Sequence, residues 1–172
     1  TDGEVLFNGV NVKDYDEEVL RDNIALAPQR AVLFKGDIKD NVAYGADEAD
    51  EARLTVALET ACAAEFVAGL DDGINAPVAQ DGANFSGGQK QRLSIARAVY
   101  KNAELMIFDD TFSALDYKTD MLVRGNIKKR FENATIVIVA QRIGTIMNAD
   151  KIIVLDDGKI AGMGRHEQLL QT

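Results

Sequence analysis

The sequence predicts an α/β fold with a mostly parallel sheet and an inserted helical block. Residues 135–139 and 151–155 are continuously apolar rather than alternating, which is typical of strands buried on both faces of a parallel sheet. Residues 105–109 form a third apolar run, and it ends in an acid. Between these sheet-forming regions and the N-terminus, residues 37–69 are rich in alanine and acids and have helical spacing.

Three short elements precede the helical block. Residues 4–9 alternate and end in a turn signal, which predicts a strand with one exposed face. Residues 16–21 indicate a short polar helix. Residues 24–27 predict an apolar strand that stops at Pro28, because proline lacks the N–H that a sheet ladder needs.

The helical block should bury one face of its main helix. Ala57 lies beside that face, whose members recur at helical spacing: Leu54, Leu58, Ala61 and Cys62. Residues 75–84 then indicate a loop. Ser86 takes the N-cap position of a longer helix that runs to about Lys101.

The C-terminal third returns to strands after one more helix. Residues 116–131 predict that helix, with basic residues in its last turn, as the macrodipole favours, and apolar positions every four residues: Val123, Ile127 and Phe131. The Asp156-Asp157-Gly158 turn predicts a hairpin that leads into residues 159–161. His166, the only histidine, is expected to begin a C-terminal helix and to take no part in catalysis.

Composition bounds the class of protein. The 172 residues suffice for one domain with a core, and the net charge of -9 argues against a nucleic-acid partner, because no excess of basic residues can displace phosphate counterions. Cys62 is the only cysteine, which rules out an internal disulfide and suggests a reducing compartment. No apolar run reaches the ~18 residues of a membrane span.

One motif is suited to phosphate. Ser86 would cap the helix whose first turn offers unpaired backbone N–H groups, and Gly87 and Gly88 carry no Cβ that would keep a phosphate away. A bare Ser-Gly-Gly can also be an ordinary helix start. Here the string continues as Gln89-Lys90-Gln91-Arg92, and Ala96-Arg97-Ala98 follows.

A second motif is suited to a metal ion. Asp109 ends the apolar run of residues 105–109, so its carboxylate should project from the end of a buried strand, where α/β folds place ligands. Mg²⁺ is usually held by one or two carboxylates together with substrate phosphates. Many strands end in an acid, but this one is followed closely by Ser113-Ala114-Leu115-Asp116.

Together these motifs resemble the signature motif, Walker B strand and D-loop of ABC-type ATPases, and the resemblance covers essentially the whole chain. It implies a P-loop NTPase-like core with a mostly parallel sheet, formed by residues 1–34 and 102–172. Residues 35–101 would form a helical subdomain that ends in the signature helix. It also implies that ATP and Mg²⁺ are the cofactors.

The resemblance assigns roles residue by residue. Ala27-Pro28-Gln29 is similar to the Q-loop, so Gln29 would lie near Mg²⁺ and the γ-phosphate, while Asp109 would bind Mg²⁺. Residues 33–42 and 77–84 resemble exporter segments, the latter being the X-loop that touches the coupling helices of transmembrane domains, with Gln80 in place of its usual Glu. The nucleotide-binding residues would be Ser86, Gly87, Gly88, Gln89 and, in the D-loop, Asp116.

Two positions depart from the family. Asp110 stands where these ATPases usually carry the catalytic Glu, and Gln141 stands where they usually carry a His. Asp keeps the charge but withdraws the carboxylate by roughly 1.5 Å, and a misplacement of ~1 Å can cost about a hundredfold in rate. Gln can bind a phosphate oxygen but cannot take the cationic role of imidazole. These substitutions suggest a hydrolytically impaired site, although tolerated drift in a working enzyme is the alternative.

The phosphate-cradling Gly-x-x-x-x-Gly-Lys-Ser/Thr motif does not occur in the 172 residues. In the family it precedes the strand expected at residues 4–9, and the chain begins at Thr1 rather than Met, so we interpret the sequence as a fragment that lacks the N-terminal part of the core. We expect such a fragment to bind ATP poorly, and its strand at residues 105–109 to lack a sheet neighbour.

Family geometry predicts the partners. ABC nucleotide-binding domains dimerise head to tail, so the intact signature of this chain would complete the partner's ATP site. We expect a heterodimeric exporter of multidrug or lipid type, at the cytoplasmic face of the cell membrane, whose partner carries the usual Glu and His. A fully active homodimeric exporter, a non-transport ABC ATPase and a noncatalytic fragment remain as alternatives.

Overall fold

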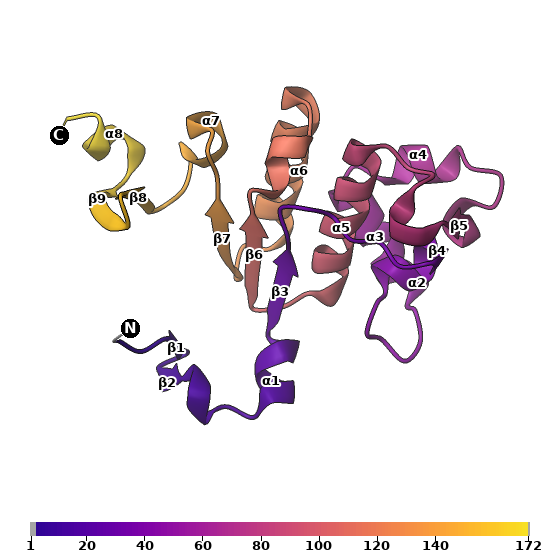
Figure 1. The fold of residues 1–172 in the computed structure, drawn as a ribbon, viewed down its shortest axis with the longest axis horizontal. Helices are drawn as coiled ribbons and strands as arrows, with labels where there is room; N and C mark the ends of the chain where they lie inside the picture. Colours follow the sequence, from indigo (N-terminus) through magenta and orange to yellow (C-terminus); the bar gives the residue numbers. More distant parts are fainter. Residues whose placement is uncertain (1–2, 172) are drawn as a thin grey trace.

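The centre of the molecule is a three-stranded parallel sheet. The computed structural model describes residues 3–171, and the sheet has the order β3-β6-β7 (Figure 1). The strands are β3 (Ile24–Ala27), β6 (Leu105–Asp109) and β7 (Thr135–Val139). In register, Ala27 lies beside Phe108, and Phe108 lies beside Ile138. An α/β fold with a parallel sheet is therefore confirmed.

The strand β6 has a neighbour on each side. The expectation that residues 105–109 would lack a sheet partner is wrong, because β3 and β7 both pair with β6 along its length. The run that ends in Asp109 is thus the central strand of the sheet, and its main-chain groups are hydrogen-bonded on both edges.

Only one face of this sheet is buried. Side chains alternate across a strand, and the row formed by Ala25, Met106 and Ile136, together with the parallel row through Phe108, points into the core. The opposite row contains Leu26 and Val137, both exposed. Residues 135–139 are therefore half-buried rather than buried on both faces as predicted, because helices of the described chain cover only one side.

The run at residues 151–155 does not join the parallel sheet. It forms β8 (Ile152–Asp156), which pairs antiparallel with β9 (Lys159–Gly164) in a separate two-stranded sheet, and most of β8 is exposed. The prediction of a buried parallel strand is wrong here. The hairpin turn itself is confirmed: Asp157 and Gly158 both adopt positive φ, as a tight turn requires.

Helices fill the region between β3 and β6. They are α2 (Ile38–Val42), α3 (Glu51–Thr60), α4 (Ala64–Ala68) and α5 (Gly87–Lys101). Short elements join them: β4 (Gly36–Asp37), η2 (Gly73–Asn75), β5 (Pro77–Val78) and η3 (Gln80–Gly82). The predicted face of α3 is buried, except that the helix ends before Cys62, which has a φ of 54° and is only half-buried.

The remaining elements lie near the two ends of the chain. Before β3 come β1 (Leu6–Phe7), β2 (Val10–Asn11), η1 (Val12–Asp14) and α1 (Glu17–Asp22), so residues 4–9 contain a shorter strand than expected. After β6 come η4 (Thr111–Ala114), α6 (Tyr117–Arg130), α7 (Ile143–Ile146) and, after β9, α8 (His166–Leu169). His166 thus begins the last helix, as predicted.

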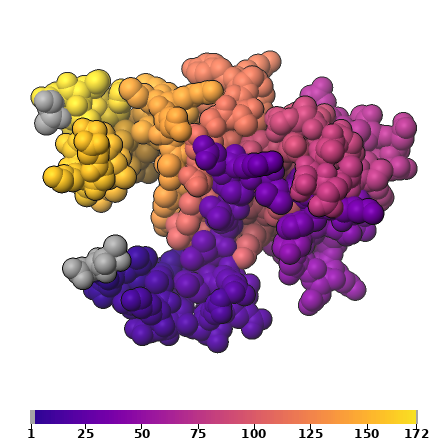
Figure 2. Space-filling model, viewed as in Figure 1, coloured from indigo at the N-terminus to yellow at the C-terminus, as the bar shows by residue number. Residues whose placement is uncertain are grey.

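The overall shape is elongated, with the helices α2–α4 at one end and the β8–β9 hairpin at the other (Figure 2). A single cluster of buried apolar side chains runs from the helices into the sheet. Within residues 3–171, no helix is both long enough and apolar enough to cross a bilayer.

Phe108 tests how far stability depends on the covered face. Its side chain is fully buried in the central strand, and its ring centroid lies 5.2 Å from that of Phe112. We expect Phe108→Ala to lower the free energy of unfolding by about 3–5 kcal/mol, because both burial and packing are lost. Denaturant unfolding measures this loss.

The matched control is Val137→Ala on the uncovered face, where the side chain is 43% exposed. We expect a loss below about 1 kcal/mol there, because less apolar surface is removed from contact. Equal losses at the two positions would contradict the assignment of a single buried face.

Candidate functional site

Three loops meet at the carboxyl edge of the parallel sheet. Gln29, Asp110 and Gln141 each follow one strand of the sheet, and the carboxyl ends of parallel strands lie at the same edge. Gln29 Nε2 donates to Asp110 Oδ2 at 3.1 Å, and Gln141 Nε2 donates to the same oxygen at 3.2 Å. The structure therefore brings these three predicted site residues together.

The main chain holds Asp110 in a fixed place. Its backbone has φ 43° and ψ 24°, the left-handed region that Asp tolerates better than most residues. Its N–H donates to the carbonyl of Val139 at 2.9 Å, and its own carbonyl accepts from the Ser113 hydroxyl at 2.7 Å. With the backbone held in this way, the short side chain can move its carboxylate only by rotation.

The residues at this edge suit a magnesium ion that arrives with phosphate. Asp109 is exposed at the end of β6 and directly precedes Asp110, whose carboxylate accepts from the Gln29 amide. In the described part of the chain, no cluster of three or more His, Cys, Asp or Glu side chains could hold a metal by itself. Mg²⁺ is usually held by one or two carboxylates together with the phosphates of a substrate, and Asp109 could supply one such carboxylate.

The start of α5 forms the second part of the candidate site. Ser86 and Gln89 make a capping box, in which Gln89 N–H donates to Ser86 Oγ at 3.3 Å and Ser86 N–H donates to Gln89 Oε1 at 2.9 Å. A Cβ added at Gly87 would meet no atom within 4 Å. The space beside Gly87 is therefore unfilled, and the binding of an anion to the first turn of this helix stays a prediction.

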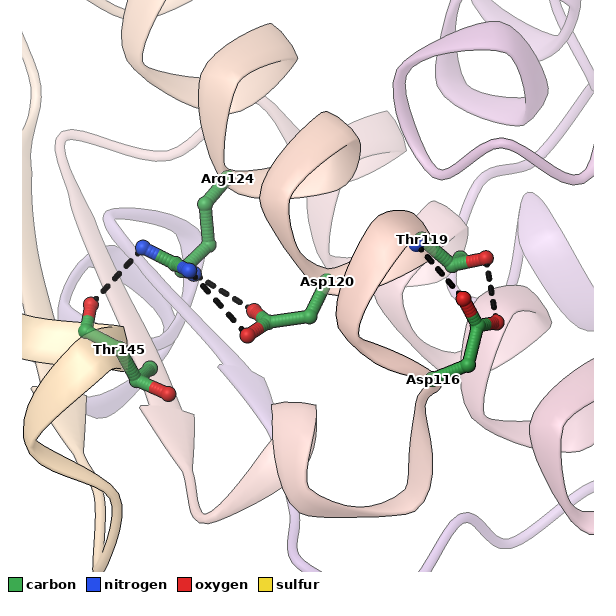
Figure 3. Close-up of polar contacts among 5 residues, drawn as sticks. All are labelled: Asp116, Thr119, Asp120, Arg124 and Thr145. Carbon is green, nitrogen blue, oxygen red and sulfur yellow. Dashed lines mark hydrogen bonds and ion pairs between the residues drawn. The ribbon is translucent and has the colours of Figure 1, made fainter.

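This helix start lies against η4. A Cβ added at Gly88 would lie 3.8 Å from the carbonyl oxygen of Ala114. Asp116 follows as the N-cap of α6 and accepts from the Thr119 N–H at 3.0 Å and the Thr119 hydroxyl at 2.6 Å (Figure 3). These hydrogen bonds, the hydroxyl's above all, lower the pKa of the exposed Asp116 carboxyl.

Two buried residues fix the loop that carries Gln29, and sequence reasoning gave neither a role. Thr111 is fully buried, and its hydroxyl donates to the carbonyl of Ala27 at 2.6 Å. Gln91 is buried in α5, and its Nε2 donates to the carbonyl of Pro28 at 3.1 Å. Gln91 stood inside the recognised motif, whereas no pattern in the sequence marked Thr111.

Sequence reasoning also missed an ion pair in α6 and its link to α7. Asp120 and Arg124 form a largely buried ion pair in α6, and Arg124 also reaches the carbonyl of Thr145 in α7 (Figure 3). The acid-to-base spacing of four residues was visible in the sequence and could have indicated the pair. Its link to α7 depends on tertiary structure, which the spacing does not reveal.

Comparison with known proteins identifies the family of the chain. The family model described as ABC transporter matches residues 1–113. A solved structure described as a bacterial Atm1-family ABC exporter with ATP bound superposes with a TM-score of 0.94 and 36% sequence identity, covering 99% of this chain and 30% of that one. The chain belongs to the ABC transporter family.

Curated relatives are similar over nearly the whole chain. An ABC transporter ATP-binding protein of Mycobacterium tuberculosis is 46% identical over 173 residues, which is 99% of this chain and 29% of that protein. An ATP-dependent lipid A-core flippase of Burkholderia orbicola is 44% identical over 171 residues, with 99% and 29% covered. The chain thus spans less than a third of the length of these relatives.

The Asp116 cap predicts a pH dependence. A carboxyl whose pKa is lowered by folding contributes stability that is present above its unfolded pKa and lost as pH falls through the lowered folded value. We expect Thr119→Ala to raise the pKa of Asp116 toward its ordinary value, because the hydroxyl donor is removed while the backbone donor stays. NMR titration of the Asp116 carboxyl measures the change.

The matched control is Thr55→Ala, which removes another helical hydroxyl that bonds only to the Glu51 carbonyl at 2.9 Å. It should leave the pKa of Asp116 unchanged. The stability advantage of wild type over Thr119→Ala should shrink on acidification below about pH 4, near the reference value for Asp. An advantage that stays constant through that window would contradict the assigned cause.

Proposed function

We propose that this chain is the ATP-binding part of an ABC exporter and that it acts at the cytoplasmic face of the cell membrane, attached to transmembrane domains. The observation that carries this proposal is the meeting of Gln29, Asp110 and Gln141 at the carboxyl edge of the sheet, next to Asp109. The high similarity to an exporter structure and to lipid A-core flippases supports export, with a lipid-type substrate favoured.

Two parts of the chain would serve two different ATP sites. In a head-to-tail dimer, Gln29, Asp109, Asp110 and Gln141 serve the chain's own site. The open start of α5, from Ser86 to Gln89, would complete the partner's site through its backbone N–H groups and the Ser86 hydroxyl. Asp116 caps the neighbouring helix and would lie at the same dimer interface.

Each residue of the chain's own site has a role that suits its chemistry. Asp109 and the amide oxygen of Gln29 would hold Mg²⁺, which supplies charge neutralisation at the phosphates when it is bound with ATP. Asp110 would orient the attacking water and accept its proton. Gln141 would hydrogen-bond the terminal phosphate with its amide.

The geometry favours an impaired site over a fully active one. Two amide donors already occupy Asp110 Oδ2, and the fixed backbone keeps this shortened side chain from advancing. Gln141 has no titrating group to replace imidazole. We therefore propose a heterodimer whose partner carries the competent catalytic residues, and a fully active homodimer remains the alternative.

A non-transport ABC ATPase that acts on nucleic acid is disfavoured. The net charge of -9 means that the chain has no overall excess of basic residues to neutralise a phosphate backbone. The match to an exporter structure, over 99% of the chain, also points to transport. Binding to duplex DNA at low salt would contradict this part of the proposal.

The decisive experiment measures ATP binding and turnover by a longer chain in which a phosphate-binding loop precedes these residues. We expect the longer chain alone to bind ATP and to turn it over about a hundredfold more slowly than a mixture with its partner, since a misplaced carboxylate costs about that much. The double variant Asp110→Glu/Gln141→His should recover much of the difference in the chain alone.

A matched control separates the two sites. Ser86→Ala should lower turnover of the mixture, because it alters the partner's site, while ATP binding to the chain's own site stays within about twofold of wild type. Rapid turnover by the wild-type chain alone would show that Asp110 and Gln141 are adequate catalytic groups. The heterodimer proposal would then fail, while the assignment as an ATPase would stand.

A further inference from the structure

A largely buried ion pair occupies the inner side of α6. Arg124 Nε and Nη2 donate to the two carboxylate oxygens of Asp120 at 2.6 and 3.1 Å. The side chains are only 15% and 4% exposed, respectively. Burying such a pair gives little net stability compared with apolar side chains of similar size, because both charges lose their hydration. We therefore look for a role of this ion pair in positioning neighbouring segments rather than in stability.

The remaining guanidinium nitrogen of Arg124 bonds to a residue outside α6. Arg124 Nη1 donates to the carbonyl of Thr145 at 3.0 Å, and Thr145 is buried in α7 (Figure 3). Since Asp120 fixes the plane of the guanidinium through two bonds, the direction of the third bond is fixed as well. Arg124 thus holds the main chain of α7 at a set distance from α6.

The end of β7 and the segment that leads to α7 are bound at further points. The Asp110 N–H donates to the carbonyl of Val139, and Arg142 Nη2 donates to the carbonyl of Ser113 at 3.1 Å. A cavity of about 10 Å³, room for one water, lies between residues 110–113 and 139–145. Gln141 lies between these attachment points and is itself exposed.

We propose that Arg124 is a positioning residue that acts through the Thr145 carbonyl to keep the Gln141 amide beside Asp110. Gln141 has a flexible side chain, so a 3.2 Å bond to Asp110 requires its main chain to be held. Arg124 also joins this loop to α6, the helix capped by Asp116. The expected effect of Arg124 on nucleotide binding rests on the proposed function, whereas its effect on the position of the loop does not.

Arg124→Lys separates the geometry from the charge. Lysine keeps a cation beside Asp120, but it has no planar fork that can bond Asp120 twice and Thr145 once. Asp120→Asn/Arg124→Gln is the second variant, which removes both charges and leaves none unpaired in the interior. Arg130→Lys, at the exposed end of the same helix, is the matched control.

The first measurement is hydrogen exchange in the longer chain assembled with its partner. We expect Arg124→Lys to speed exchange in the peptide that covers residues 139–147 by about tenfold or more, because the loop loses its anchor. Peptides from α5 and the Arg130→Lys control should stay within twofold of wild type. Unchanged exchange at residues 139–147 in both Arg124 variants would overturn the proposal.

The second measurement is the ratio of the dissociation constants for ADP and ATP. A donor aimed at the terminal phosphate raises this ratio, whereas a general loss of structure weakens both nucleotides together. We expect Arg124→Lys and Gln141→Ala each to lower the ratio about five- to tenfold, and the double variant to lower it no further than Gln141→Ala alone. Additive effects would mean that Arg124 acts independently of Gln141, and would overturn the positioning role.

The two measurements also separate this inference from the proposed function. A wild-type chain that binds neither nucleotide would contradict the proposed function, and the exchange data would then still decide whether Arg124 anchors residues 139–147. Faster exchange with an unchanged nucleotide ratio would reduce Arg124 to a structural residue.

Discussion

The parallel pairing of β6 with both β3 and β7 is the constraint on which the candidate site depends. Because all three strands run the same way, the loops that follow them leave the sheet at one edge. Gln29, Asp110 and Gln141 come from distant parts of the sequence and reach one another only through this arrangement. A slip of one residue in either pairing would turn the buried row of β6 outward and separate these loops.

Bonds from side chains to main-chain carbonyls then fix the loops beyond the strands. Thr111 bonds to Ala27, Gln91 to Pro28, Arg142 to Ser113, and Arg124 to Thr145. A carbonyl acceptor fixes the path of the chain without specifying the side chain at that position. The exposed side chains that face a ligand can therefore differ while the backbone around them stays in place.

Local patterns predicted the elements well and their assembly less well. The predicted N-cap at Ser86 is confirmed, and the apolar spacing of α6 agrees with the burial of Val123 and Ile127. The run at residues 151–155 misled because continuous apolar character shows only that a strand needs cover, not which strand pairs with it. The expectation that residues 135–139 are buried on both faces failed for the same reason, because an apolar run does not show which faces of the strand are covered.

Prediction of the candidate site from the sequence was limited in a similar way. Motif resemblance pointed to Gln29, Asp110 and Gln141, and their hydrogen bonds agree with a shared location, but their catalytic roles are still predictions. Thr111 and Arg124 escaped notice because their importance lies in bonds to residues 84 and 21 positions away along the chain. A single sequence contains no local signal for such contacts.

The geometry around Gln29 lets one amide serve two neighbours. Its Nε2 donates to Asp110 Oδ2, which leaves Oε1 as the kind of neutral oxygen that Mg²⁺ accepts. An ion drawn to Asp109 and to Gln29 Oε1 would fix the orientation of the amide and strengthen its donation to Asp110. Gln141 donates to the same oxygen from the opposite strand. Both amides therefore meet at one oxygen of Asp110, so a ligand bound by either amide would alter the hydrogen bonding of this carboxylate.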